Sequence, residues 1–228
     1  MIQQENKLIG QIQVINAETL VNVFQSQSIK TVFKKIIKRS KTLFDCEQGV
    51  NILLDLNSPS FLIETVWKDN VEYGSVGMSS EKVDQYLAGL QKRKYPVVLF
   101  HTHTPTIAGK YSKYDYIPSH ADLLNLTDAR ETAKDVAKYD GFPITIIGII
   151  VGNTIQMLLI QETGIISSCT RKYCTQDMGY VQSLRDIIDT LKQYGYNAAQ
   201  ITYNLKTGVL AHDPQTLNTF SYIPRNIE

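Results

Sequence analysis

Two histidines separated by a single threonine follow directly on a short apolar run near the middle of the chain. The run covers residues 97–100, and the histidines are His101 and His103. In an extended backbone, residues two apart point to the same face, so a strand that ends here presents both imidazoles to one point. We interpret residues 97–122 as the stretch around which the rest of the chain is organised.

A carboxylate follows at the start of the next expected element. Ser119 is a suitable N-cap for a helix, and Asp122 lies three residues further on, in the first turn. Two histidines and one carboxylate form the ligand set of a catalytic zinc site, which keeps a fourth position for water. An isolated His-x-His pair is weak evidence, but this pair closes an apolar strand and precedes a Ser-x-x-Asp motif. We therefore predict a zinc site formed by His101, His103 and Asp122.

The charge balance of the chain limits the classes of partner. Its 23 Lys and Arg residues against 22 Asp and Glu leave a net charge of +1, so no general field attracts nucleic acid. The densest basic run, residues 34–41, has apolar residues at helical spacing and is interpreted as the solvent face of an amphipathic helix. Nucleic acid is therefore not an expected partner.

The chain also lacks the sequence signals of a membrane or secreted protein. No apolar stretch approaches the roughly 18–20 residues that a membrane helix needs, and the first residues do not have the layout of a signal peptide. The cysteines, Cys46, Cys169 and Cys174, are odd in number and irregularly spaced, which argues against a disulfide framework. We expect ordinary thiols and a cytoplasmic protein with no membrane partner.

The expected elements indicate an α/β unit with a C-terminal extension. Helices are expected over residues 28–43, 80–93, 119–138 and 181–194, and strands over residues 8–14, 51–56, 61–67, 71–78, 97–103, 143–151, 155–161, 200–205 and 209–210. Residues 165–180 are polar and contain two cysteines. The expected division is an N-terminal segment over residues 1–24, a main domain over 25–162 and an extension over 163–228.

The loop between the two halves of the expected metal site, residues 104–117, is rich in Gly, Tyr, Lys and Thr. It has almost no core-forming aliphatic residues, so we expect no structural element of its own, and its two ends place it over or beside the metal. Tyr111, Tyr114 and Tyr116 are candidate substrate-binding residues, because tyrosine provides contact area at low entropy cost. The alternative is a tolerated surface insertion.

Taken together, these motifs resemble those of the JAMM metalloproteases, the MPN/JAB-domain family. That family carries a glutamate, then His-Ser/Thr-His-Pro, then Ser-x-x-Asp; the second and third motifs match at residues 101–103 and 119–122. The resemblance covers roughly residues 25–162. This sequence departs at Thr104, which replaces the usual proline, and in its longer loop before Ser119. The resemblance implies an MPN/JAB-like α/β fold, in which helices flank a mixed, mainly antiparallel sheet, with a C-terminal α+β extension beyond it.

The resemblance also implies roles for particular residues. The family glutamate precedes the first buried strand, where Glu47 stands, and it would act as the general base; Glu64 and Glu72 are rivals for this position. Ser119 would stabilise the oxyanion, which is compatible with a capping role because a cap uses only one lone pair of the hydroxyl. Zn²⁺ would be held by the three ligands already named, and the substrate would be the extended tail of a ubiquitin-like or other protein, cleaved at an amide or isopeptide bond.

Two other functions stay open at this point. The run over residues 47–55 is also similar to RadC-type proteins, which would imply a role in DNA repair; the lack of a basic face argues against it. A non-catalytic MPN interaction module is the second alternative, and the retention of every motif residue argues against it. The extension over residues 163–228 could bind a partner, close over the site or mediate a homodimer.

Overall fold

The structure is a computed structural model, and it describes residues 16–40, 47–55, 60–64, 80–92, 94–103, 112–221 and 225–226. Several expectations lie outside these residues: the strands over 8–14 and 71–78, the first part of the loop over 104–111, and the side chains of Cys46, Glu72 and Tyr111.

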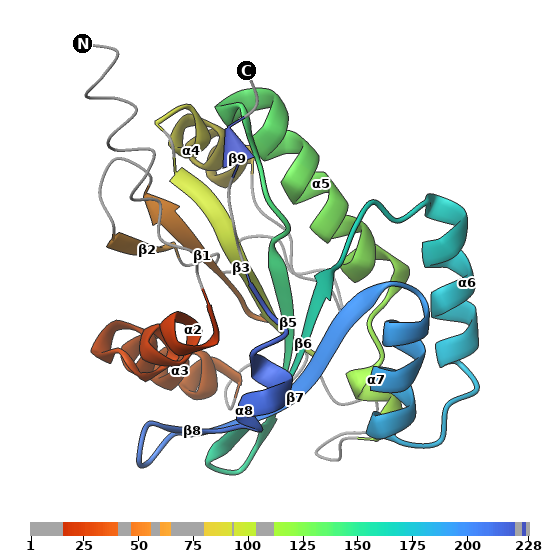
Figure 1. Ribbon diagram of the computed structural model, residues 1–228. Coiled ribbons are helices and arrows are strands. Elements are labelled where there is room, and N and C mark those ends of the chain that lie inside the picture. Colours follow the sequence, from red (N-terminus) through yellow and green to blue (C-terminus); the bar gives the residue numbers. More distant parts are fainter. Residues whose placement is uncertain are drawn as a thin grey trace.

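One mixed sheet of seven strands forms the centre of the molecule (Figure 1). In spatial order the strands are β2 (Ser60–Glu64), β1 (Gly49–Asp55), β3 (Lys94–Thr102), β5 (Ile144–Val151), β6 (Thr154–Glu162), β7 (Tyr196–Asn204) and β8 (Val209–Ala211). Only β3 and β5 pair in parallel; every other neighbouring pair is antiparallel. The expected α/β class with a mainly antiparallel mixed sheet is therefore present. A second, two-stranded sheet joins β4 (Tyr139–Asp140) to β9 (Arg225–Asn226).

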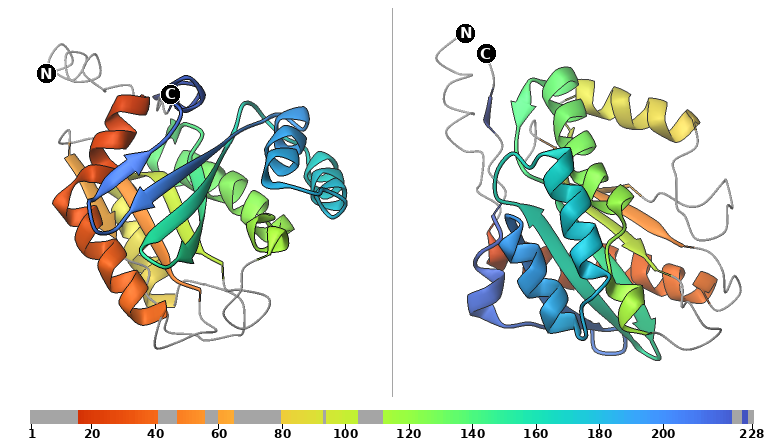
Figure 2. Two further views of the ribbon diagram at one scale, coloured as in Figure 1. Left: turned by 90° about the horizontal axis from the view of Figure 1, so that it is seen from below. Right: turned by 90° about the vertical axis from the view of Figure 1, so that its right-hand side faces the viewer.

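Helices cover both faces of the large sheet (Figure 2). One face carries α2 (Ala17–Gln25) and α3 (Gln27–Ser40); the other carries α4 (Ser80–Gln91), α5 (His120–Ala137), α6 (Ser168–Met178) and α7 (Leu184–Gln193). A short helix, α8 (Pro214–Leu217), follows β8. Because both faces are covered, β5 buries six consecutive residues from Ile144 to Ile149 and shows no polar alternation.

The face under α3 is packed with aromatic rings. Phe33 lies with its ring centroid 5.2 Å from that of Phe100 on β3 and 5.0 Å from that of Tyr203 on β7. Lys34 and Lys38, from the basic run of the sequence, are exposed on the opposite side of the same helix. The expected amphipathic helix with a solvated basic face is confirmed.

The parallel pair determines where the expected metal ligands meet. Parallel strands need a crossover connection, and here α5 supplies it between β3 and β5. Its first turn therefore lies at the carboxyl end of β3, where a parallel strand and the N-terminus of the following helix commonly form a binding site.

A β-bulge interrupts the pairing of β1 with β3. Ile52 pairs with Val98 and Leu53 pairs with Pro96, so Val97 is an extra residue on β3. Pro96 has no backbone N–H to donate to the ladder, and prolines within sheets are found at such irregular positions. Beyond the bulge the register is regular and brings Gly49 opposite His101.

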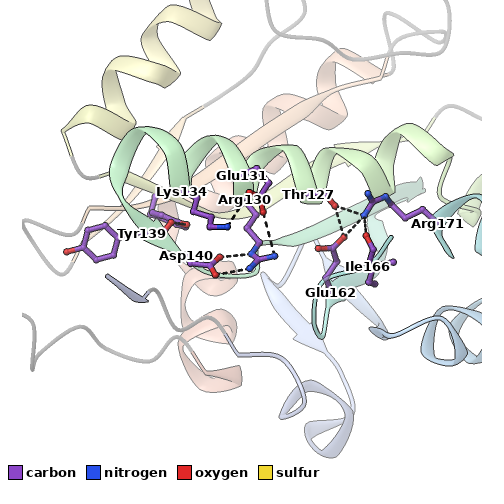
Figure 3. A network of polar contacts seen from close by, with 10 residues as sticks. Thr127, Arg130, Glu131, Lys134, Tyr139, Asp140, Glu162, Ile166 and Arg171 are labelled. Carbon is purple, nitrogen blue, oxygen red and sulfur yellow. Dashed lines mark hydrogen bonds and ion pairs between the residues drawn. The ribbon is translucent and has the colours of Figure 1, made fainter. Parts of the chain in front are cut away.

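The C-terminal part of the chain shares the sheet and the core of the part before it. β7 pairs with β6 along its whole length, from Glu162–Tyr196 to Thr154–Asn204. Arg171 on α6 donates through Nη1 to Glu162 Oε1 on β6 (3.3 Å), to Thr127 Oγ1 on α5 (2.8 Å) and to the carbonyl oxygen of Ile166 (2.6 Å) (Figure 3). The division at residue 162 remains a prediction. Within the described part of the chain, no helix is both long and apolar enough to cross a membrane.

Candidate metal centre

The strand β3 delivers both histidines of the His-x-His pair to the side of the sheet that α5 covers. His101 is near the end of the strand, and His103 follows it directly. Their Nε2 atoms lie 3.2 Å apart, and the ring centroids are separated by 5.1 Å. The two rings converge on one point, as the period of an extended strand predicts.

Asp122 completes the cluster from the first turn of α5. Its Oδ1 is 3.1 Å from Nε2 of His101 and its Oδ2 is 3.5 Å from Nε2 of His103; the side chains are 12% (His101), 14% (His103) and 13% (Asp122) exposed. A capping box fixes the turn, because the N–H of Asp122 donates to Ser119 Oγ (3.1 Å) and the N–H of Ser119 donates to Asp122 Oδ2 (2.7 Å). The helix cap therefore also orients the carboxylate toward the histidines.

The donor atoms fit a small divalent ion. Ligands about 2.0–2.1 Å from a tetrahedral zinc ion are separated from one another by about 3.3 Å. The two imidazole nitrogens are 3.2 Å apart, and the Asp122 carboxylate approaches them to 3.1 and 3.5 Å through its two different oxygens. These residues are the one group of three or more His, Cys, Asp or Glu side chains in the described part of the chain with this closeness. His101, His103 and Asp122 could hold a metal ion.

The charges of the cluster are strongly coupled. Burial favours the neutral form of Asp122, but its contacts with His101 and His103 outweigh burial and hold the pKa of the carboxyl well below its ordinary value. Burial also lowers the pKa of His103, yet the hydrogen bond to Asp122 and the negative charges of Asp122 and Glu47 raise that pKa above 6.5 overall. The site therefore carries a negative potential that favours a cation.

Glu47 lies two residues before β1, the strand next to the histidines. The N–H of Gln48 donates to Thr102 Oγ1 (2.9 Å), and the N–H of Thr102 donates to the carbonyl oxygen of Gln48 (2.8 Å). This pairing places Glu47 level with His103, near enough for its charge to raise the pKa of that imidazole. Glu64, the rival, is on β2, whose neighbour is β1 and not β3. The register thus favours Glu47 as the carboxylate beside the site.

Ser119 is exposed at the N-terminus of α5, and its hydroxyl oxygen is engaged in the cap. The hydroxyl hydrogen is not needed for that bond, because the oxygen accepts there. The expected N-cap is confirmed, and the second expected role of Ser119 stays a prediction.

The tyrosines of the long loop are placed differently from one another. Tyr114 and Tyr116 belong to a short 3-10 helix, η1 (Lys113–Tyr116). Tyr114 is exposed, whereas Tyr116 packs against the buried cluster around α5 and α7, and its hydroxyl donates to Gln156 Oε1 on β6. The expectation that the loop has no structural element of its own is therefore wrong for residues 112–117, because aromatic packing and one cross-strand hydrogen bond stabilise this part. Substrate binding by these tyrosines is untested.

Asp115 was not among the residues expected at the site from the sequence. Its backbone carbonyl oxygen lies 2.7 Å from Nδ1 of His103, and its carboxylate accepts a hydrogen bond from the N–H of Ser112. A second Ser-x-x-Asp pattern at residues 112–115 is the signal that could have identified the turn.

Comparison with known proteins adds no family to this description. A scan against protein-family models, a search of curated proteins and a search of solved structures each gave no match. The residues of the site carry the functional argument by themselves.

Proposed function

We propose that this protein is a zinc-dependent metallopeptidase of JAMM type with an MPN/JAB-like fold, hydrolysing an amide or isopeptide bond. One observation carries the proposal: two imidazole nitrogens and the Asp122 carboxylate converge with closest separations of 3.1–3.5 Å, and Glu47 lies beside them, just before the adjacent strand β1. The resemblance of the two motifs to the JAMM pattern supports the choice of reaction.

In this proposal His101, His103 and Asp122 hold the ion. When bound, zinc supplies Lewis-acid chemistry, because it acidifies water and polarises a carbonyl group. The capping box keeps the Asp122 carboxylate turned toward the imidazoles, so the ligand geometry needs little rearrangement. The low pKa of Asp122 keeps this ligand ionised at neutral pH.

Two further side chains perform the proton and charge steps. Glu47 accepts a proton from the attacking water and passes it to the leaving amine, as a general base and then a general acid. Ser119 donates its hydroxyl hydrogen to the oxyanion that develops on the substrate carbonyl, while its oxygen continues to accept from the N–H of Asp122. The position of Glu47 beside His103, and that of Ser119 at the cap of the helix that carries Asp122, support these two roles.

The proposed substrate is a protein or peptide with an extended tail, such as that of a ubiquitin-like protein. The ligand side chains are only 12–14% exposed, so the reacting bond has to be presented on a thin, extended segment. Tyr114 is exposed on η1, where it offers an aromatic surface to such a segment.

Zinc analysis and hydrolysis assays test this proposal. The purified protein should contain about one zinc per chain, and His101→Ala combined with His103→Ala should remove it. His212→Ala is the matched control, since His212 lies beyond β8 and its Nδ1 is 3.4 Å from the carbonyl oxygen of Leu210. Unchanged zinc in the double variant would refute the ligand assignment.

The base is tested with a second pair of variants. Glu47→Gln keeps the volume of the side chain but cannot accept a proton, so zinc should stay bound while cleavage of a tail-peptide substrate falls by about 10²–10⁴-fold. Glu64→Gln is the control. An inactive Glu64→Gln variant beside an active Glu47→Gln variant would show that the base is Glu64. Zinc binding without cleavage of any tail would favour a non-catalytic module.

A further inference from the structure

The turn around Asp115 contacts the metal centre from outside the ligand set. The backbone carbonyl oxygen of Asp115 lies 2.7 Å from Nδ1 of His103. A carbonyl oxygen can only accept, so Nδ1 has to carry the hydrogen of this bond. In the neutral ring Nε2 then carries the free lone pair, and Nε2 is the atom that faces His101 and Asp122. The contact selects the tautomer that a metal ligand needs.

This carbonyl is held in place by the side chain of the same residue. Asp115 is 4% exposed, and its carboxylate accepts a hydrogen bond from the N–H of Ser112, which closes the turn. The N–H of Asp115 donates in turn to the carbonyl oxygen of Ser112 at 3.2 Å. Asp115 therefore fixes both ends of the turn that carries its own carbonyl.

The turn of residues 112–116 is joined to the sheet through the next residues. Directly after Asp115, Tyr116 donates from its hydroxyl to Gln156 on β6, and Tyr116 and Ile117 pack against the buried cluster that includes Leu123 of α5. The turn is thus a packed part of the molecule and presents the carbonyl at a defined position.

His101 has no equivalent support. In the parts of the chain that the structure describes, its ring contacts are those with His103 and Asp122 through Nε2, and no carbonyl faces its Nδ1. Among the described residues, a carbonyl oxygen faces Nδ1 of His103 and none faces Nδ1 of His101.

We propose that Asp115 is a positioning residue for the metal centre. Its carboxylate closes the turn of residues 112–116, and the turn aims the Asp115 carbonyl at His103 so that Nε2 is free to bind the ion. This role rests on the proposed function, in which His103 is a ligand. Groups that orient a ligating histidine in this way typically contribute 10–100-fold to metal affinity.

The tautomer can be read in the metal-free protein. Long-range ¹H–¹⁵N correlation spectra of the full-length protein, recorded at a pH above the raised pKa of His103 so that the ring is neutral, should show His103 with its hydrogen on Nδ1. In Asp115→Ala, where the carboxylate that closes the turn is lost, His103 should become a mixture of tautomers. The spectrum of His212, whose Nδ1 lies 3.4 Å from the carbonyl oxygen of Leu210, serves as an internal reference and should not change. A wild-type His103 protonated on Nε2 would overturn the proposal, whatever the protein does with zinc.

Zinc affinity gives the second readout, by competition with a chromogenic chelator. Asp115→Ala should bind zinc about 10–100-fold more weakly than the wild type. Asp115→Asn should stay within about threefold of the wild type, because Asn and Asp are equally good acceptors for a backbone N–H. Asp213→Ala is the matched control: its carboxylate caps α8 by accepting from the N–H of Gln215 (3.0 Å), away from the site.

The outcomes separate this proposal from the proposed function. If the wild type binds no zinc but shows His103 protonated on Nδ1, the function is wrong and the positioning role of the turn still stands. If the wild type binds zinc and Asp115→Ala binds it equally well with an unchanged tautomer, the positioning proposal fails and the metal site stands. A loss in Asp115→Asn as large as that in Asp115→Ala would also refute it, since the capping acceptor is then not what matters.

Discussion

Arg171 makes the strongest test of how the C-terminal part of the chain is joined to the sheet. The side chains of Arg171 and Glu162 are only 7% and 3% exposed, and their closest charged atoms are 3.3 Å apart. Nη1 of Arg171 also donates to Thr127 Oγ1 and to the carbonyl oxygen of Ile166 (Figure 3). Arg171→Ala therefore leaves a buried carboxylate without its cation and a buried carbonyl without its donor.

The expected cost follows from that burial. Removing one partner of a buried ion pair typically lowers the free energy of unfolding by about 3–5 kcal/mol, since the other charge stays buried and uncompensated. Arg185→Ala is the matched control, because Arg185 pairs with Asp189 at 4.0 Å where the two side chains are 90% and 57% exposed. The control should lose no more than about 0.5 kcal/mol.

The loss in free energy of unfolding of Arg171→Ala should also depend on pH. Burial raises the pKa of Glu162, and the hydrogen bond from Thr127 and the charge of Arg171 oppose that rise. Removing Arg171 lets the pKa of Glu162 rise further, so the folded variant holds a proton at a pH where the unfolded chain has released it. A raised carboxyl pKa makes stability fall as pH rises from the unfolded value through the folded value. The deficit is therefore largest at neutral pH and shrinks on acidification.

Urea unfolding followed by circular dichroism measures both effects. The deficit of Arg171→Ala should be clearly smaller at about pH 5 than at about pH 8. In a Glu162→Gln background, where residue 162 carries no charge, that pH dependence should vanish. A deficit below about 1 kcal/mol at neutral pH, or one that is equal at both pH values, would show that the buried pair does not join α6 to the sheet as the structure indicates.

Two further predictions concern the core and the thiols. A Cβ at Gly148 would lie 2.7 Å from Cζ of Phe100, so Gly148→Ala should lower the free energy of unfolding by about 1–3 kcal/mol; Phe100→Leu in the same chain should recover part of the loss, and strictly additive losses in urea unfolding would contradict the predicted clash. Cys169 is exposed, whereas burial, and then the charge of Asp177, raises the pKa of Cys174 to about 12. Peptide mapping after brief alkylation should therefore find Cys169 modified and Cys174 protected until the protein is unfolded, and equal labelling of both in the folded protein would contradict the packing of α6.

The sequence was informative wherever a short period carries the information. His101 and His103 meet because side chains two apart on a strand share a face, and Asp122 joins them because a capping box places it in the first turn of a helix. The pairing of β3 with β5 is different, since it depends on a crossover helix and on partners 46 residues apart, such as Val98 and Ile144. The composition and spacing of the residues near the histidines do not predict the register between β3 and β5.

The helix α6 shows why part of the fold could not be predicted. Its buried residues are Arg171, Cys174 and Met178, at helical spacing. The first of them is an arginine that is buried only because Glu162 and Thr127 are there to receive it. A prediction from apolar periodicity treats arginine as a surface residue. The buried face of this helix could therefore not be recognised from the sequence.

The turn at Asp115 escaped prediction for a related reason. Its stability comes from Tyr116 reaching Gln156 across 40 residues of sequence, and from one backbone N–H bound by a carboxylate. Local composition indicated an unstructured loop, because glycine, lysine and tyrosine form no apolar stripe. The turn forms because of contacts with residues that are distant in the sequence, such as Gln156.

The extra residue in β3 has a consequence for how this chain tolerates insertions and deletions. Pro96 and Val98 pair with adjacent residues of β1, so a deletion of Val97 would leave a regular ladder with every other pair of the two strands intact. The segment between Val98 and His101 has no bulge residue that could absorb a deletion or insertion. Such a change would turn both imidazoles to the face where Phe33 fills the core, since a shift of one residue exchanges the two faces of a strand. Deletion of Val97 would therefore cost the packing of a buried side chain but keep the ligand pair, whereas a change of one residue between Val98 and His101 destroys that pair.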